Sequence, residues 1–182
     1  IMPGEADVFF FGNSGAEAIE GAIKLARFHT RRSGIIAFMG GFHGRTMGAA
    51  SVGSSKASYR LGHGPLVPGI YFSKYPYTYR SSNSNNIEQE VENSLVHLDE
   101  LFRHVINPEE VAAMLVEPIQ GEGGYVVPPK PWLAELRKIC DRYGILLIFD
   151  EVQTGFGRTG EWWASNHFSI EPDIMAIAKA IA

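Results

Sequence analysis

The chain has 182 residues, of which 45% are hydrophobic and 20% are charged, so it is long enough to bury a globular core. Its net charge of −4 argues against a nucleic-acid surface, which requires a basic stripe, and no apolar run is long enough to cross a bilayer. We therefore expect neither nucleic acid nor membrane as a partner. The single cysteine, Cys140, cannot form an internal disulfide, which favours a reducing cytoplasm, and its apolar helical surroundings predict a buried thiol.

The two ends suggest an interior piece of a longer protein. Residues 1–4 lead almost at once into an apolar run at 8–11, which we expect to form a strand. The chain then stops directly after the residues richest in chemistry. We expect residues 1–182 to form the core of a single domain.

The first half begins with the polar turn 12–15, followed by apolar residues at three- and four-residue spacing that predict a helix over 16–31. Ser14 and Gly15 stand at its N-terminal edge. The further expected segments are an apolar run at 34–39, a glycine-rich loop at 40–44, a stretch without periodicity at 71–86 that ends in an exposed, mobile loop at 81–86, and a helix at 87–104.

The second half repeats a strand–helix rhythm. Its expected elements are a strand at 112–116, a helix at 131–143 ended by Gly144, a buried strand at 145–149, a short helix at 161–168 and a strand at 173–178. This alternation predicts a three-layer α/β/α fold with a mostly parallel sheet covered on both faces. Ligands of such sheets lie beyond the carboxyl ends of the strands. The polar segments fall there: 13–15, 41–44, 117–124, 150–153 and Lys179. Their coincidence predicts one site.

Asp150 and Lys179 each follow an apolar strand. A carboxylate at the end of a buried strand is costly unless it is paired. Asp150 could be a cap or ion-pair partner, or equally a fixed anion that keeps a heteroaromatic nitrogen protonated. Lys179, taken alone, reads more simply as a snorkelling lysine. A lysine in an apolar setting, however, has a lowered pKa and becomes a nucleophile for an aldehyde carbon.

Two loops could bind an anion and a flat ring. The turn 13–16 lies at a helix N-terminus, where free N–H groups attract anions, although simple N-capping would use the same residues. Phe42 stands beside His43 and Gly44 after a strand. Its ring could pack within the loop or act as a stacking platform for a flat cofactor.

Other chemistries find little support. Residues 155–160 match G-x-G-x-x-G, but Asp150 and Glu151 precede the glycines, where a pyrophosphate would be repelled, so we reject a dinucleotide site there. The six histidines are scattered rather than set at metal-ligand spacing, and no metal is expected.

Together these segments resemble the class III aminotransferases that depend on pyridoxal 5′-phosphate (PLP) and have fold type I, the group that includes the 4-aminobutyrate and ornithine aminotransferases. The matching blocks are 13–18, 42–46, 117–124, 147–160 and 173–179. They stand in the family's order and span nearly the whole chain. The resemblance implies that residues 1–182 are a partial fold type I large domain, with the N-terminal segment and the small C-terminal domain outside the chain.

The resemblance also implies a role for each candidate residue. Lys179 would carry the cofactor as a Schiff base and shift a proton, and Asp150 would pair with the pyridinium nitrogen. Val152 would pack on one ring face and Phe42, with His43 in the same cofactor-binding loop, on the other. The remaining contacts would come from Gln153 to the phenolic oxygen, from backbone groups of Ser14, Gly15 and Ala16 to the phosphate, and from Glu117, which would support the site near Asp150.

Glu122 resembles the glutamate that pairs with and releases an arginine in the 4-aminobutyrate and ornithine enzymes; that arginine would lie past Ala182. The resemblance thus implies ping-pong transfer from an ω-amino acid such as 4-aminobutyrate to 2-oxoglutarate by a homodimeric parent protein, the fragment alone being inactive. A racemase or aminomutase with the same cofactor site is the nearest alternative. A nucleotide-binding oxidoreductase that uses residues 155–160, and a non-catalytic domain that does not bind PLP covalently, are further alternatives.

Overall fold

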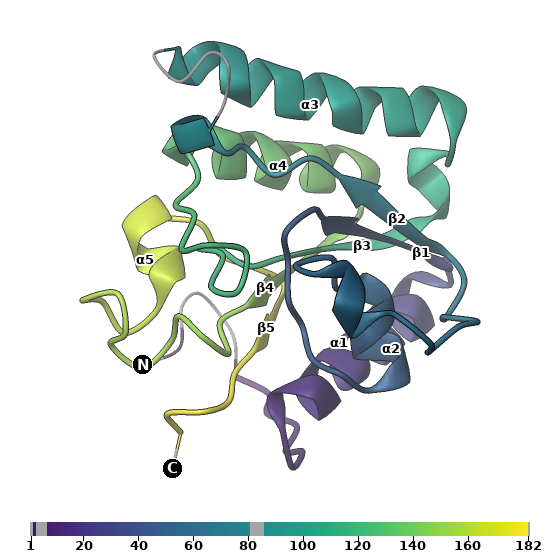
Figure 1. Ribbon diagram of the computed structural model, residues 1–182, viewed down its shortest axis with the longest axis vertical. Coiled ribbons are helices and arrows are strands. Elements are labelled where there is room, and N and C mark those ends of the chain that lie inside the picture. Colours follow the sequence, from purple (N-terminus) through teal and green to yellow (C-terminus); the bar gives the residue numbers. More distant parts are fainter. Residues whose placement is uncertain (1, 3–6, 81–85, 182) are drawn as a thin grey trace.

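The computed structural model describes residues 2, 7–80 and 86–181 (Figure 1). The expected mobile loop lies almost wholly outside these residues. The helices and strands are α1 (Gly15–Thr30), β1 (Gly34–Phe38), α2 (Met47–Val52), β2 (Ile70–Ser73), α3 (Ile87–His104), β3 (Val111–Val116), α4 (Lys130–Tyr143), β4 (Leu146–Asp150), α5 (Ala164–Phe168) and β5 (Ile174–Ala176). Short 3-10 turns lie at Ala57–Tyr59, Thr78–Arg80 and Pro108–Glu110.

The five strands form one parallel sheet in the order β2-β1-β3-β4-β5. The chain runs from β1 to β2 on one side and then returns past β1 to β3, so the direction of winding reverses between β1 and β3. In open sheets of this order, ligands bind at such a switch point, beyond the carboxyl ends of the strands.

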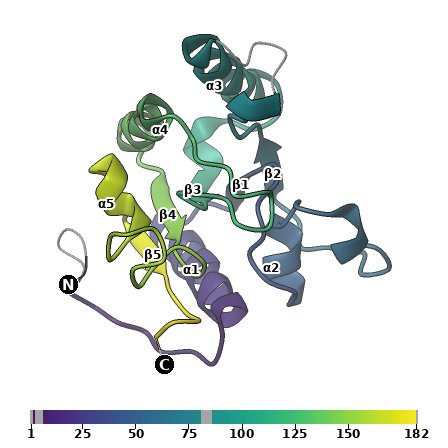
Figure 2. The same ribbon diagram turned by 60° about the vertical axis from the view of Figure 1, so that its left-hand side comes forward.

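Helices cover both faces of the sheet. Successive side chains of a strand point to opposite faces, so each buried strand contributes apolar residues to two separate cores. Met114 and Leu147 pack into the core formed with α3 and α4, whereas Leu115 and Ile148 pack into the core beneath α1 and α2. All four side chains are fully buried. Figures 1 and 2 show the two helix layers on opposite sides of the strands. The expected three-layer α/β/α fold is therefore confirmed.

Helix α1 begins at a hydrogen-bonded cap. The Ser14 hydroxyl accepts the N–H of Glu17 at 3.2 Å, and the Glu17 carboxylate accepts the backbone and side-chain N–H groups of Asn13. These bonds lower the pKa of Glu17. They fix the direction in which the first turn of α1 faces the carboxyl end of the sheet.

The opposite, amino-terminal edge of the sheet is tied by one arginine. Arg32 Nη1 donates to the carbonyl oxygens of Val111 at 3.2 Å, Tyr143 at 2.9 Å and Gly144 at 3.1 Å. Gly144 ends α4, as the sequence predicted, and its φ of 62° is a left-handed conformation that favours glycine. Arg32 thus joins the segment after α1 to the start of β3 and the end of α4.

Two local expectations were wrong, and one helix was missed. Residues 8–11 form no strand, and the side chains of Val8 and Phe10 are 88% and 84% exposed. Among the described residues no strand pairs with this run, and an isolated strand does not persist. Within the supposedly irregular stretch, β2 pairs with β1 as a short edge strand. Helix α2 was missed because its six residues are too few to show a period.

No helix in the described part of the chain is long and apolar enough to span a membrane. Cys140 is buried on α4, as expected, and burial raises the pKa of its thiol to about 12.

Candidate active site

The loops that follow four strands converge at the carboxyl end of the sheet. His43 follows β1, Glu117 follows β3, Asp150 ends β4 and Lys179 follows β5. Because all strands are parallel, these ends share one edge. The predicted single site therefore has the arrangement that the topology requires.

A buried histidine–aspartate pair lies at the centre of this edge. His43 Nδ1 and Asp150 Oδ2 are 2.7 Å apart, and their side chains are 1% and 4% exposed. The second oxygen of Asp150 accepts the N–H of Val152 at 3.0 Å. Burial lowers the pKa of His43, but the hydrogen bond to Asp150 and the charges of Asp150 and Glu117 outweigh burial, so the net effect raises this pKa. His43 therefore binds a proton more readily than a histidine in water, with the Asp150 carboxyl group as its direct partner.

Glu117 joins two loops across the switch point. Its carboxylate accepts the N–H of Phe42 at 2.8 Å and that of Gly121 at 2.9 Å. Burial, and to a lesser extent the charge of Asp150, raise the pKa of Glu117 against the opposing effects of His43 and the two N–H donors. The expected position of Glu117 near Asp150 agrees with this geometry.

Two supporting residues were not found from the sequence. The buried Tyr75 hydroxyl donates to the carbonyl oxygens of Glu117 at 3.2 Å and Pro118 at 3.4 Å. Gln120 Nε2 donates to the carbonyl oxygen of Met39 at 2.9 Å. Tyr75 belongs to no recognisable pattern, and Gln120 lies in the matching block 117–124 but was given no role there, because each acts through a contact between segments distant in sequence.

The N-terminus of α1 packs directly against the loop after β4. A Cβ on Gly15 would lie 2.8 Å from Val152 Cγ1, and one on Gly44 would lie 2.6 Å from Ala16 Cβ. The Ser14 hydroxyl accepts a hydrogen bond from the N–H of Glu17. The N–H groups of Gly15 and Ala16 have no partner within the helix, because they lie in its first turn, and they can bind an anion. The candidate phosphate-binding turn therefore lies beside the candidate ring-contacting valine.

Lys179 donates a hydrogen bond from Nζ to Gln153 Oε1. Lys179 is exposed, as a snorkelling lysine would be, and does not have the apolar setting that was the alternative interpretation of the sequence. Lys179 follows β5, which is the edge strand, and among the described residues no further strand pairs with the outer side of β5. The backbone at Lys179 has a φ of 57°, so the residue departs sharply from the direction of the strand.

Glu122 and Phe42 lie nearer the surface. The Glu122 carboxylate is 3.8 Å from Lys56 Nζ, and both side chains are about half exposed. The ring of Phe42 makes an edge contact with Tyr59, with centroids 5.4 Å apart. Phe42 is half-buried, which leaves part of its ring accessible.

The glycines of residues 155–160 serve the backbone of their loop. Gly157 and Gly160 have φ values of 84° and 93°, which favour glycine. A Cβ on Gly155 would lie 2.8 Å from the ring of Trp163. These requirements explain the motif without a dinucleotide.

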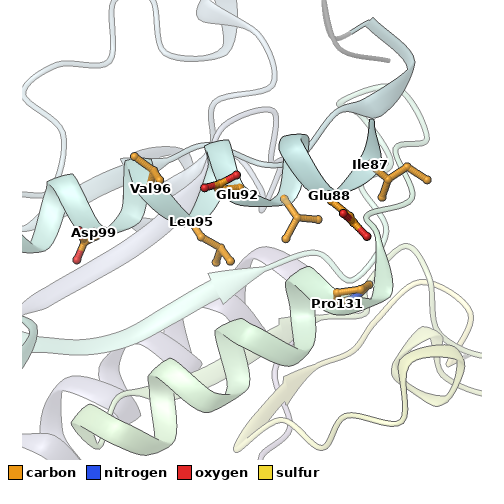
Figure 3. A pocket seen from close by; sticks show the side chains of 8 residues that line it. Ile87, Glu88, Glu92, Leu95, Val96, Asp99 and Pro131 are labelled. Carbon is orange, nitrogen blue, oxygen red and sulfur yellow. The ribbon is translucent and has the colours of Figure 1, made fainter. Parts of the chain in front are cut away.

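An apolar groove of about 460 Å³ lies elsewhere, between α3 and α4 (Figure 3). Ile87, Leu95 and Pro131 line it, with Glu88 and Glu92 also at its wall. It contains none of the residues that follow the strands. The candidate site is therefore assigned by its converging side chains, not by this groove.

The family profile described as "Aminotransferase class-III" matches residues 1–182. The chain belongs to the class-III aminotransferase family. Its relatives include the alanine/serine racemase of Pyrococcus horikoshii, 44% identical over 100% of this chain and 40% of the relative. The probable 4-aminobutyrate aminotransferase of Bacillus subtilis is 39% identical over 100% and 42%, and the acetylornithine aminotransferase of Methanosarcina mazei is 47% identical over 94% and 38%. The chain thus spans about two fifths of these relatives.

Solved structures give the same family. An (S)-enantioselective ω-transaminase from Thermomicrobium roseum superimposes with a TM-score of 0.91 at 38% identity, over 98% of this chain and 41% of that one. An amine transaminase from an uncultivated Pseudomonas species, in its PLP-bound (internal aldimine) form, superimposes with a TM-score of 0.85 at 35% identity, over 92% and 39%.

Class-III aminotransferases depend on PLP, and the residues at the carboxyl edge fit this group. Asp150 is a buried carboxyl group at a strand end, Lys179 offers an amine shortly after the adjacent strand, and the close contact of Gly15 with Val152 forms a cradle that a side chain would fill.

Proposed function

We propose that residues 1–182 are the large-domain core of a PLP-dependent transaminase. Its reaction moves an amino group from an ω-amino acid such as 4-aminobutyrate to 2-oxoglutarate. The observation that carries this proposal is the pairing of β4 with β5, which brings Asp150 and the segment leading to Lys179 side by side, with Asp150 held by His43.

PLP would supply a cationic ring that accepts the electron pair released when the substrate carbon beside nitrogen loses its proton. Asp150 would hold the proton on the ring nitrogen, because its buried carboxyl group is fixed by the 2.7 Å contact with His43 and can accept a hydrogen bond from that nitrogen. Lys179 Nζ would take the substrate proton and return it, since its amine lies at the site edge beside Gln153.

The other contacts follow from the positions described above. The free N–H groups of Gly15 and Ala16, with Ser14 at the helix cap, would hold the phosphate. Phe42 and Val152 would flank the ring, and Gln153 would hydrogen-bond its phenolic oxygen. Two neighbouring residues complete the site: His43 and Glu117 would keep Asp150 and the loop at 40–44 in place.

An ω-amino donor is supported by two observations. Relatives include the probable 4-aminobutyrate aminotransferase of Bacillus subtilis and a 5-aminovalerate aminotransferase of Pseudomonas putida, both named for ω-amino acids. The half-exposed carboxylate of Glu122 lies 3.8 Å from Lys56 Nζ, and Lys56 in turn lies over the ring of Tyr59. This carboxylate can therefore exchange partners as different substrates arrive.

A cytoplasmic location agrees with the free thiol of Cys140.

We also propose that the full-length protein is a homodimer. The apolar run 8–11 is exposed in this chain, and surface of that kind is normally covered by a partner or by further chain.

Amino-acid racemisation is the second candidate, favoured by the 44% identity to the alanine/serine racemase. The same lysine and cofactor would serve, but no amino group would pass to 2-oxoglutarate.

The test uses the full-length protein purified with PLP, reduced with borohydride and mapped by peptide mass spectrometry. We expect the pyridoxyl label on Lys179, loss of the label in K179A and retention in the matched surface variant K24A. A separate, unreduced sample is assayed for glutamate formed from 4-aminobutyrate and 2-oxoglutarate, and for inversion of L-alanine. Absence of any labelled lysine would refute the cofactor assignment, and inversion without glutamate would favour the racemase.

A further inference from the structure

Glu151 is a fully buried carboxylate for which the proposed reaction gives no role. It is 0% exposed. One oxygen accepts the hydroxyl of Thr154 and the N–H of Ala164 at 3.0 Å, and the other accepts the N–H of Ser165 at 2.8 Å. Within residues 7–80 and 86–181, no lysine, arginine or histidine lies within ion-pair distance of it. Its carboxyl oxygens are therefore held by hydrogen-bond donors alone, and losing one of these bonds in a fully buried site would be costly.

These donors come from both ends of the loop between β4 and α5. Thr154 lies in the turn directly after Glu151, whereas Ala164 and Ser165 begin α5. The backbone of Glu151 adds two further ties: its N–H donates to the carbonyl of Ala176 on β5 at 2.9 Å, and its carbonyl accepts the N–H of Gly155 at 2.9 Å. One residue thus fixes the start of the loop, its return and its attachment to β5.

The turn that Glu151 closes carries two of the candidate cofactor contacts. Val152 packs on Gly15 at the N-terminus of α1. Gln153 contacts Lys179, and its Cγ would lie 2.9 Å from a Cβ on Gly121. Val152 therefore lies close to Gly15 and Gln153 close to Gly121, so the turn is tied from inside by Glu151 and packs from outside against two neighbouring segments.

A purely structural role would be simple capping of α5, for which the two N–H bonds suffice. The bond to Thr154 goes further, because it connects the cap to the turn that carries Val152 and Gln153. Gly155 supports this connection, since the absence of its side chain lets the turn pack directly on Trp163.

We propose that Glu151 is a positioning residue that sets the places of Val152 and Gln153 against the cofactor. It touches neither the cofactor nor the substrate and acts through the turn 151–155. This inference rests on the proposed function, because Val152 and Gln153 matter in this way only if PLP binds beside them.

The test compares E151Q with wild type in the full-length protein, and E161Q serves as matched control because Glu161 is an exposed glutamate of the same loop. In E151Q an NH₂ group replaces one carboxylate oxygen and faces a hydrogen-bond donor. Two donors cannot bond to each other, so that hydrogen bond is lost. We expect hydrogen exchange of the amides at 164 and 165 in the PLP-free protein to accelerate by about tenfold to a hundredfold, the range for a lost bond to a charged group. We also expect the dissociation constant of PLP to rise by about tenfold.

The decisive reading is spectroscopic. In E151Q the pH midpoint of the visible band of bound PLP should shift by about half a unit or more, roughly a threefold change in the protonation equilibrium. If E151Q only lowers the melting temperature, and the midpoint and PLP affinity match those of E161Q, Glu151 is merely structural and the proposal is overturned. Should E151Q fail to fold, T154V removes a single donor and decides the question with a smaller effect. A wild type that does not bind PLP at Lys179 would instead refute the proposed function, while the exchange of the PLP-free protein would still show whether Glu151 holds the loop.

Discussion

Replacing His43 by alanine removes the side chain that pairs with the buried Asp150. Asp150 would keep the N–H of Val152 at 3.0 Å but lose the 2.7 Å bond to His43 Nδ1. Removing one partner of a buried ion pair costs about 3–5 kcal/mol, because the remaining charge is left uncompensated. Since one donor stays, we expect H43A to lower the free energy of unfolding by about 3 kcal/mol.

The loss should depend on pH in a direction that the raised pKa of His43 determines. The folded state binds the proton more tightly than the unfolded state, so the stabilisation is fully present below about pH 6.5, the ordinary pKa of histidine. It declines as the pH rises through the higher pKa of the folded protein. The difference between wild type and H43A should therefore be larger at pH 6 than at pH 9.

Urea denaturation of the PLP-free protein at both pH values measures this difference, with H29A as the control at an exposed histidine on α1. Adding D150N to H43A should recover part of the loss, because it removes the uncompensated charge. An H43A variant within about 0.5 kcal/mol of wild type at both pH values, or a difference that grows with pH, would refute this reasoning.

Two further predictions follow from local contacts. In G15A the new methyl group would lie 2.8 Å from Val152 Cγ1, so we expect the free energy of unfolding measured in urea to fall by about 1–3 kcal/mol. Adding V152A to the same chain should restore part of this stability, and a double variant no more stable than G15A would contradict the contact. Cys140, with its thiol pKa raised to about 12 by burial, should resist a thiol reagent at pH 8 in the native protein and react only in denaturant, as followed by mass spectrometry.

The elements that the sequence predicted well are those with a long or fully buried pattern. Helix α3 matches its expected range of 87–104, and the buried runs of β3 and β4 begin within one residue of the expectation. The failures are short or exposed. Strand β2 has four mostly half-buried residues at the edge of the sheet, and the apolar run 8–11 has no paired strand among the described residues. Whether such a run pairs depends on what lies beside it, which a local pattern does not contain.

At the candidate site, the sequence indicated the positions but not the contacts. His43 was singled out as part of a glycine-flanked loop, yet its bond to Asp150 spans 107 residues of sequence. The exposure of Lys179 follows from the place of β5 at the sheet edge, which only the strand order reveals. Glu151 was read with Asp150 as one acidic pair, whereas the structure gives the two carboxylates separate donors.

The three hydrogen bonds of Arg32 at the amino-terminal end of the sheet have a consequence for protein engineering. Strands β3 and β4 contain six and five residues. The hydrogen bonds of Arg32 at their amino ends are therefore roughly 16 Å or more from the candidate site at their carboxyl ends. Residues so far apart, with no shared partner, usually contribute to stability independently. Stabilising substitutions around Arg32 can thus be combined with libraries of variants in the loops that carry His43, Glu117 and Lys179. The added stability would let the protein tolerate destabilising changes in those loops.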